Sequence, residues 1–168
     1  MTTNIVVGLQ TQNTISLAAY GAAEETGAQL GLVKGGVSIE HDTTAQEIMV
    51  DQYLGPIDII TTAESLTVKT SLAEAILANL AAALGAAAPE QNALNLTTAA
   101  DNFYTLYINV KGAHGKKRKY TFWKCKVKGK TAQAYKRDGE TVADIEFNVL
   151  VDASKSADCR FGKVEDLD

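Results

Sequence analysis

The fold is decided by one stretch near the C-terminal end, residues 142–151, which reads VADIEFNVLV. In an extended chain, one face of this stretch carries Ala143, Ile145, Phe147, Val149 and Val151. The opposite face carries Val142, Asp144, Glu146 and Asn148. A strand of this kind packs its apolar face on a core and leaves its polar face in water. The stretch therefore predicts a long antiparallel strand whose outer face is wet and acidic.

The sequence just before this strand predicts a β-hairpin. Apolar and polar residues alternate over 104–110, the segment 111–117 reverses the chain at two glycines, and 119–128 returns it. Residues 131–136 predict another strand, which a tight turn at Asp138-Gly139 ends. The C-terminal half is therefore expected to consist almost entirely of strands and turns.

Further strands are predicted in the first half of the chain. Residues 37–42 alternate as a half-buried strand does, and residues 46–53 either continue that strand or pair with it. Gly55-Pro56 predicts a turn, because proline fixes its own φ and disfavours helix at the residue before it. β-branched residues dominate 57–70, which favours extended structure.

One helix is predicted, over residues 71–84. Ser71 and Glu74 have the spacing of a capping box, and Gly85 stands where a C-terminal cap belongs. The apolar stripe of this helix consists of Leu72, Ile76, Leu80 and Leu84, with Leu77 widening it. Such a helix packs one face on a sheet.

These elements together predict a mainly β fold, an antiparallel β-sandwich or barrel with one packed helix. A chain of 168 residues is sized for a single domain with its own core. Residues 1–36, which are rich in glycine, alanine and threonine, predict a loop-dominated N-terminal arm with at most short strands. Residues 37–168 are expected to form the core.

Charge is unevenly distributed along the chain. The net charge is −4, yet eleven of the sixteen Lys and Arg residues fall between Lys111 and Arg137. Residues 138–168 hold nine acidic residues against three basic ones. The N-terminus has no basic segment followed by a long apolar run, so we expect synthesis in the cytoplasm without a signal peptide and no membrane partner.

No motif in the sequence predicts a catalytic, cofactor or metal site. Gly129-Lys130-Thr131 resembles the end of a phosphate-binding loop, but Lys124 stands where that motif needs its first glycine. His41 and His114 have no nucleophile or metal partner at a suitable spacing, and the two cysteines lie far apart. The protein is therefore expected not to be an enzyme.

Two interpretations of the lysine-rich segment 116–130 remain open. Lysines interleaved with Tyr120, Phe122 and Trp123 are typical of a surface that binds single-stranded nucleic acid. The same alternation describes a strand with Lys124, Lys126 and Lys128 outward and Trp123, Cys125 and Val127 in the core. In that case the lysines would contact acidic surface on another protein.

Three stretches carry a resemblance to a known family. The first runs from Gly35-Gly36-Val37 through Gly55-Pro56-Ile57-Asp58 to the apolar segment 72–85. The second is Lys119-Tyr120-Thr121-Phe122-Trp123-Lys124. The third is Lys136-Arg137-Asp138-Gly139 with the strand that follows to Lys155. Together, over roughly residues 33–161, they are similar to the tail tube (major tail) proteins of tailed bacteriophages. The resemblance implies a structural virion protein that forms hexameric rings, which stack into a hollow tube for the tape-measure protein and then double-stranded DNA. Sheath, baseplate and tail terminator proteins are further partners that it implies.

The resemblance also assigns expected contacts. Asp144 and Glu146 are expected to face the lumen, where acidic side chains repel DNA phosphates. Contacts with a neighbouring subunit or ring are expected from the segment 46–60, with Gln46, Asp51, Tyr53 and Asp58, and from Lys116, Lys117 and Arg118. The inner tube of a contractile injection system, which carries proteins, is the alternative of the same class. A small nucleic-acid-binding β-domain is the alternative of another class.

Overall fold

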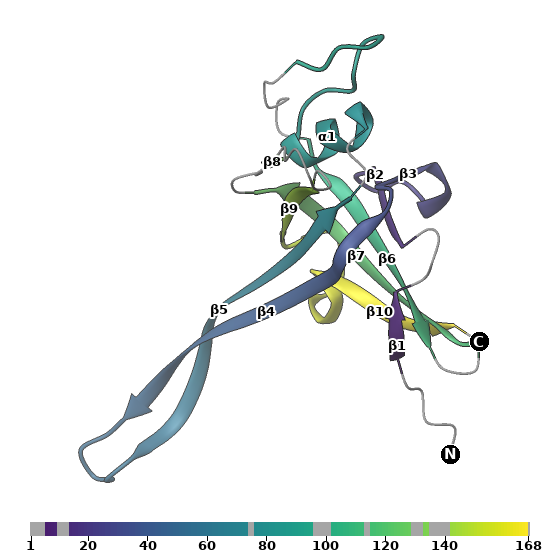
Figure 1. The fold of residues 1–168 in the computed structure, drawn as a ribbon. Helices are drawn as coiled ribbons and strands as arrows, with labels where there is room; N and C mark the ends of the chain where they lie inside the picture. Colours follow the sequence, from purple (N-terminus) through teal and green to yellow (C-terminus); the bar gives the residue numbers. More distant parts are fainter. Residues whose placement is uncertain are drawn as a thin grey trace.

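The computed structural model describes residues 6–9, 14–73, 76–95, 102–112, 115–128, 133–134 and 142–167. The chain is mainly β and antiparallel, as predicted, with one short α-helix among the described residues (Figure 1). The elements are β1 (Val6–Leu9), β2 (Ile15–Ala19), η1 (Glu24–Thr26), β3 (Ala28–Gln29), β4 (Val33–Met49), β5 (Pro56–Leu72), α1 (Leu77–Leu84), β6 (Tyr104–Gly112), β7 (Lys117–Val127), β8 (Gln133–Ala134), β9 (Val142–Val149), η3 (Ala157–Cys159) and β10 (Gly162–Leu167).

All of these strands belong to one hydrogen-bonded sheet that bends around its own core. Its main path is β3-β2-β6-β7-β9-β5-β4, with β1 beside β6, β10 beside β7 and β8 beside β9. The bend lies in β7, whose first part pairs with β6 and β10, whereas its last residues, 125–127, pair with β9. The predicted sandwich or barrel therefore takes the form of a single curled sheet in the described part of the chain.

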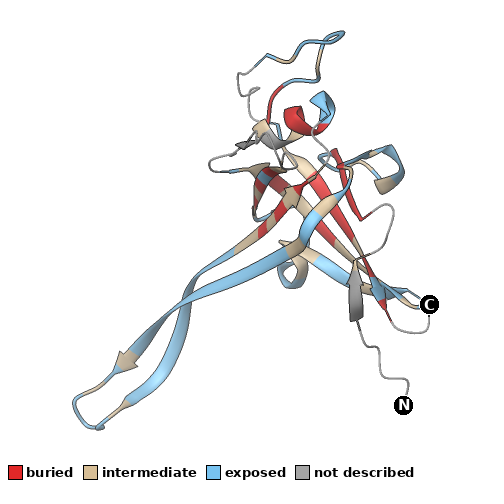
Figure 2. Ribbon diagram, viewed as in Figure 1, coloured by how far each residue is buried: buried red, intermediate tan, exposed pale blue. Residues whose placement is uncertain are grey.

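The core fills the inside of this bend, where Figure 2 shows the buried residues. It draws apolar side chains from both halves of the sheet, among them Leu106 and Ile108 of β6 and Ile145 and Phe147 of β9. The predicted alternation in β9 is confirmed, because Ala143, Ile145, Phe147 and Val149 are buried while Asp144 is exposed. Val151 lies beyond the end of β9 and is about half exposed, so the strand is shorter than predicted.

The prediction that Trp123 faces the core was wrong. The register between β6 and β7 shifts between Tyr104 and Leu106, and this irregularity turns both Phe122 and Cys125 inward. Trp123 is left partly exposed, and its indole N–H donates to the carbonyl of Cys159 at 2.8 Å. The side chain thus anchors the C-terminal segment instead of filling the core.

The predicted helix over 71–84 is too long at its start. Helix α1 begins at Leu77, and Ser71 and Leu72 are the last residues of β5. The Ser71 hydroxyl donates to the Asp144 carboxylate at 2.6 Å across the β5–β9 pair, so it caps no helix. The C-terminal end is as predicted, since Gly85 adopts the left-handed conformation with φ of 61°.

The N-terminal segment is not only a loop-dominated arm. Residues 15–19 form β2, which pairs with β6, and Ile15, Leu17 and Leu30 are part of the hydrophobic core. The long strand β4 already starts at Val33, before the expected boundary at Val37. A bulge interrupts it at Gly35 and Gly36, whose φ values of 77° and 91° are ones that glycine adopts without strain. Of the predicted strand 131–136, only Gln133–Ala134 is described, and the turn at Asp138-Gly139 lies outside the described residues.

An ion pair fastens the N-terminal segment to the sheet and gives a first prediction. The carboxylate of Glu24 lies 2.5 Å from Lys119 Nζ and accepts a hydrogen bond from Asn109 at 2.7 Å. Partial burial raises the pKa of Glu24, but the bonds to Lys119 and Asn109 outweigh it, so the pKa stands below its ordinary value of 4.5. The ionised form is therefore the one that stabilises the fold, and this stabilisation is lost as pH falls through the lowered pKa.

We expect Glu24→Gln to lower the free energy of unfolding at pH 7 by about 1 kcal/mol, because glutamine keeps the acceptor for Asn109 and loses the charge. Urea unfolding at pH 7 and in strongly acidic buffer measures this. In acid the difference between wild type and variant should vanish, since Glu24 is then protonated in both the folded and the unfolded chain. An equal difference at both pH values would contradict the prediction.

Candidate assembly interface

The outer parts of β4 and β5 form a long hairpin that leaves the body of the molecule. We call residues 43–63 the β4–β5 arm. Strand β5 pairs with β9 only from Leu66 onward, so in the arm β4 and β5 pair only with each other among the described strands. Figure 1 shows the arm extending away from the rest of the sheet, and Figure 2 shows it exposed along its length. Two antiparallel strands with no core beneath them are marginally stable on their own in water.

The arm carries a dense set of apolar side chains that nothing in the described structure covers. Six of them are about half to fully exposed: Met49, Tyr53, Leu54, Ile57, Ile59 and Ile60. Leu54 at the turn is fully exposed, and Tyr53 beside it is 68 % exposed. Contiguous exposed apolar surface of this kind marks a site of contact with another protein or an aggregation hazard. The arm is therefore the strongest candidate interface of the molecule.

Both faces of the arm carry this apolar surface. Glu47 and Ile59 are register partners and share one face, while Gln46 and Ile60 share the other. Two shifts of register within the arm, between Thr44 and Ala45 and between Ile48 and Met49, change which residues of β5 accompany those of β4. A partner that covered one face alone would leave the other in water, so the arm suits insertion between surfaces.

Every Asp, Glu, Lys or Arg residue of the arm and its root is acidic. Residues 37–68 contain six acidic residues and no lysine or arginine. The acidic residues are Glu40, Asp42, Glu47, Asp51, Asp58 and Glu64. Asp58 Oδ1 accepts a hydrogen bond from the Ile59 amide at 2.8 Å, and Asp51 is exposed in the turn. The arm thus combines apolar contact surface with a uniform negative charge.

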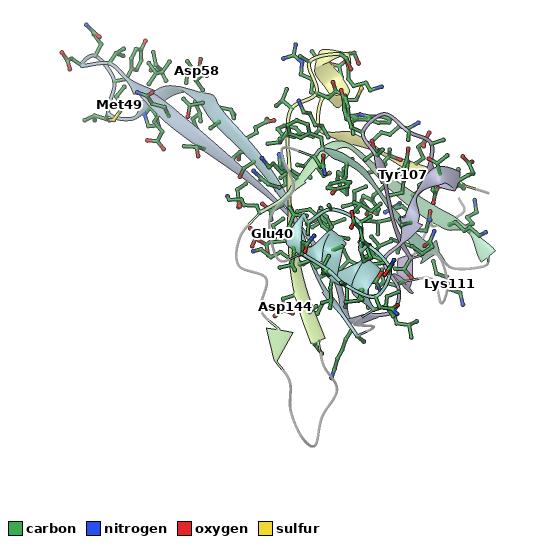
Figure 3. All side chains as sticks on the ribbon, turned by 90° about the horizontal axis from the view of Figure 1, so that it is seen from above. Glu40, Met49, Asp58, Tyr107, Lys111 and Asp144 are labelled. Atoms are coloured by element: carbon green, nitrogen blue, oxygen red, sulfur yellow. The ribbon has the colours of Figure 1, made fainter. Side chains whose placement is uncertain are left out.

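The turn between β6 and β7 lies at the far end of the molecule and is basic. Figure 3 shows Lys111 at this end, with Met49 and Asp58 of the arm at the other. Lys111 and Lys117 are register partners and are both exposed. We call Lys111, Lys116 and Lys117 the basic turn. Opposite charge at the two ends of one chain favours a head-to-tail contact between copies.

Arg118 is placed differently from the other basic residues predicted to meet a neighbour. Its guanidinium binds both carboxylate oxygens of Asp166 in β10, at 2.6 and 2.9 Å. This hydrogen bonding raises the pKa of Arg118 above its already high value. The side chain therefore fastens β10 to β7, and Lys111, which the sequence did not single out, takes its place as an exposed charge at this end.

The predicted lumen residues lie on the outer, polar face of the half-sheet β9–β5–β4. Asp144 accepts from Ser71, and Glu146 stands beside Lys69 in the β5–β9 register. Lys69 Nζ lies 2.6 Å from Glu40, and hydrogen bonding to Glu40 together with the charges of Glu146 and Asp42 raises its pKa. Figure 3 places Glu40 and Asp144 on this side of the body, near the root of the arm. The face is continuous with the arm and holds four acidic side chains against Lys69 and, at its margin, Lys34.

The aromatic residues of the lysine-rich segment offer few open faces to nucleic-acid bases, because Phe122 is buried, Tyr120 stacks on it and a lysine lies over Trp123. Lys124 Nζ lies 4.4 Å from the centre of the Phe103 ring, and Lys155 Nζ lies 4.6 Å from the Trp123 ring. A single-strand binding surface needs open aromatic faces. These contacts therefore favour the interpretation of the lysine-rich segment as a protein surface.

The residues that the sequence analysis considered for chemistry lie only partly within the residues that the structure describes. Within them, no group of three or more His, Cys, Asp or Glu side chains is placed to hold a metal ion. His41 lies exposed near the root of the arm, whereas Gly129-Lys130-Thr131 and His114 lie outside the described residues. No described helix is long and apolar enough to cross a bilayer.

The segment 46–60, from which the sequence analysis expected contacts between subunits, makes up most of the arm. The residues named in it were the polar Gln46, Asp51 and Asp58, with only one apolar residue, Tyr53. The apolar residues that dominate the arm had a visible signal, since Ile57, Ile59 and Ile60 fall on both faces of one strand. Neither a family model nor a curated protein matches the chain in the comparisons with known proteins.

Proposed function

We propose that this chain is the structural subunit of a phage-type tail tube, in which hexameric rings of one protein stack into a hollow conduit for double-stranded DNA. The observation that carries the proposal is the β4–β5 arm, which is exposed on both faces, apolar and acidic. Such an arm has no use in a solitary molecule, where it exposes apolar surface at a cost in solubility. In an assembly it reaches a neighbouring ring.

The free edge of β4 supports closure into rings. This strand is 17 residues long and ends the main path of the sheet, so its outer edge has no strand partner in the described part of the chain. A long unpaired edge is a template for pairing with another chain, and closing a ring of copies removes it. Ring formation through β4 would continue the sheet from one subunit to the next.

The polar face of the half-sheet β9–β5–β4 supports a lumen that does not retain DNA. If this half-sheet lines the channel, Asp144 and Glu146 face inward together with Glu40 and Asp42. Lys69 offsets part of this charge through its ion pair with Glu40, and the face stays negative. Phosphates of a passing duplex would then be repelled and not bound.

Electron microscopy of the purified full-length protein tests the proposal. We expect negatively stained samples at rising concentration to show rings with a central hole and then hollow cylinders. Lone particles at every concentration and at low and physiological ionic strength would overturn the proposal. Asp144 and Glu146 on the outer wall of a solved tube would overturn the lumen assignment while leaving the tube itself standing.

A further inference from the structure

The outer edge of β10 is unpaired and lies next to the basic turn. Among the described strands β10 pairs only with β7, so its other edge has no strand partner. Its last residue, Leu167, is the register partner of Lys117. Figure 1 shows β10 running to this end of the molecule, opposite the arm. A free strand edge therefore stands beside the positive charge that attracts the acidic arm.

The free edge of β10 presents main-chain hydrogen-bonding groups. The amide of Trp123 donates to the carbonyl of Phe161 at 3.2 Å, so Phe161 bonds toward β7. Residues of an antiparallel ladder alternate between bonding to the partner strand and pointing away from it. Val164 therefore points its N–H and C=O groups away from β7, and so does Asp166. Such an edge is a template for an added strand.

The side chains of β10 suit a partner strand that is both apolar and acidic. Val164 and Leu167 are 54 % and 43 % exposed. Val164 is the register partner of Tyr120, which packs against the core, so a strand added beside Val164 extends that apolar surface. Lys163 Nζ lies 2.7 Å from Glu165, and the two charges offset each other. An acidic strand is therefore not repelled along this edge.

The arm contains a strand that matches this edge in length and in character. Residues 56–61 of β5 equal the six residues of β10, and their edge away from β4 is free because β5 pairs with β9 only from Leu66 onward. Ile57 and Ile59 are each more than half exposed, with Asp58 between them. An arm laid along β10 brings its isoleucines to Val164 and its acidic turn to the lysines of the basic turn.

We propose that β10 is the strand to which the arm of a neighbouring copy is added, through main-chain hydrogen bonds at the free edge and apolar contact at Val164. The acidic turn of the arm then lies beside the basic turn. The inference deepens the proposed function and rests on it for the identity of the partner, a second copy of this chain. The contact itself needs only two copies, without a closed ring or a tube.

Cross-linking between two single-cysteine variants tests the contact. In a Cys159→Ser background the remaining thiol, Cys125, is buried, and burial raises its pKa to about 12, so it stays unreactive. One chain carries Ile59→Cys and the other, distinguished by a mass label, carries Val164→Cys. We expect a short bis-maleimide to link these two chains at least tenfold faster than it links the Ile59→Cys and Ile76→Cys variants. Ile76 is the matched control, because it is 51 % exposed and stands at the start of α1, far from β10.

A proline at the free edge tests the main-chain hydrogen bonds. Val164→Pro removes an N–H that points away from β7, so the pairing of β10 with β7 should persist. With Leu167→Cys as the cross-linking site, Val164→Pro should slow linkage to Ile59→Cys at least tenfold. Val164→Ile, which keeps the N–H and the apolar side chain, should leave the rate unchanged. Equal rates for the proline and isoleucine variants would overturn strand addition.

Electron microscopy of the same variants separates this inference from the proposed function. Fast linkage at Val164 without rings or cylinders would support the contact between the arm and β10 and overturn the tail tube. Rings and cylinders with equal linkage at Val164 and Ile76 would leave the tube standing and overturn the contact. Equal linkage at both positions without any assembly would overturn both.

Discussion

Replacing residues 46–60 with Asn-Gly is expected to abolish ring stacking while the body stays folded. Ala45 and Thr61 are register partners, so the two new residues close the shortened hairpin with the tight turn that Asn-Gly favours. The change removes the apolar side chains of the arm, none of which belongs to the hydrophobic core. Thermal unfolding should keep its midpoint, and electron microscopy should show no cylinders.

The size of this effect follows from the area that the arm offers to a partner. Burying one exposed leucine or isoleucine side chain contributes about 1.5 to 3 kcal/mol, and the arm presents six large apolar residues per subunit. Only part of this transfer energy appears as binding energy, but each subunit of a ring loses it, so the loss should prevent stacking. Cylinders of normal length from the shortened protein would exclude the arm as the stacking element.

Two point variants serve as a matched pair for this experiment. Leu54 and Gln52 lie two residues apart in the turn of the arm, and both are exposed. Leu54→Ser should raise the concentration needed for assembly about tenfold, whereas Gln52→Ser should leave it unchanged, because only the first removes apolar surface. Equal effects of the two variants would point to the shape of the turn and not to its apolar character.

The sequence predicted the strands of this protein well because their periodicity is local information. The alternation over 142–149 and the turn signal at Gly55-Pro56 both correspond to observed elements. Ser71 shows where prediction from local sequence fails. The spacing of Ser71 and Glu74 is a local signal for the start of a helix. However, the pairing of β5 with β9 buries Thr70 and Leu72 and bonds Ser71 to Asp144. The distant strand β9 therefore decides that Ser71 belongs to a strand.

The candidate interface was only partly predictable for a related reason. A dense run of β-branched residues such as Ile57-Asp58-Ile59-Ile60 is the usual signature of a buried strand, and periodicity cannot show that no core lies beneath it. The position of the basic turn opposite the arm depends on the whole path of the sheet.

A reversal of charge at both ends of the molecule is expected to separate head-to-tail contact from simple loss of charge. We consider Asp51→Lys with Asp58→Lys on the arm, and Lys111→Glu with Lys117→Glu at the basic turn. All four side chains are exposed, so the fold should tolerate both double variants. In either variant the arm and the basic turn carry the same sign, and the concentration needed for assembly should rise at least tenfold at low ionic strength.

Combining all four substitutions in one chain restores opposite signs with the polarity exchanged, so assembly should return to within about threefold of the wild type. An equimolar mixture of the two double variants should also assemble, since the arm of each then meets the turn of the other. Added salt should reduce every one of these differences, because exposed charges are screened within about 10 Å at 0.1 M ionic strength. If the fourfold variant instead shows the summed losses of the two doubles, the arm and the basic turn do not touch, and the acidic arm must meet a different surface of its neighbour.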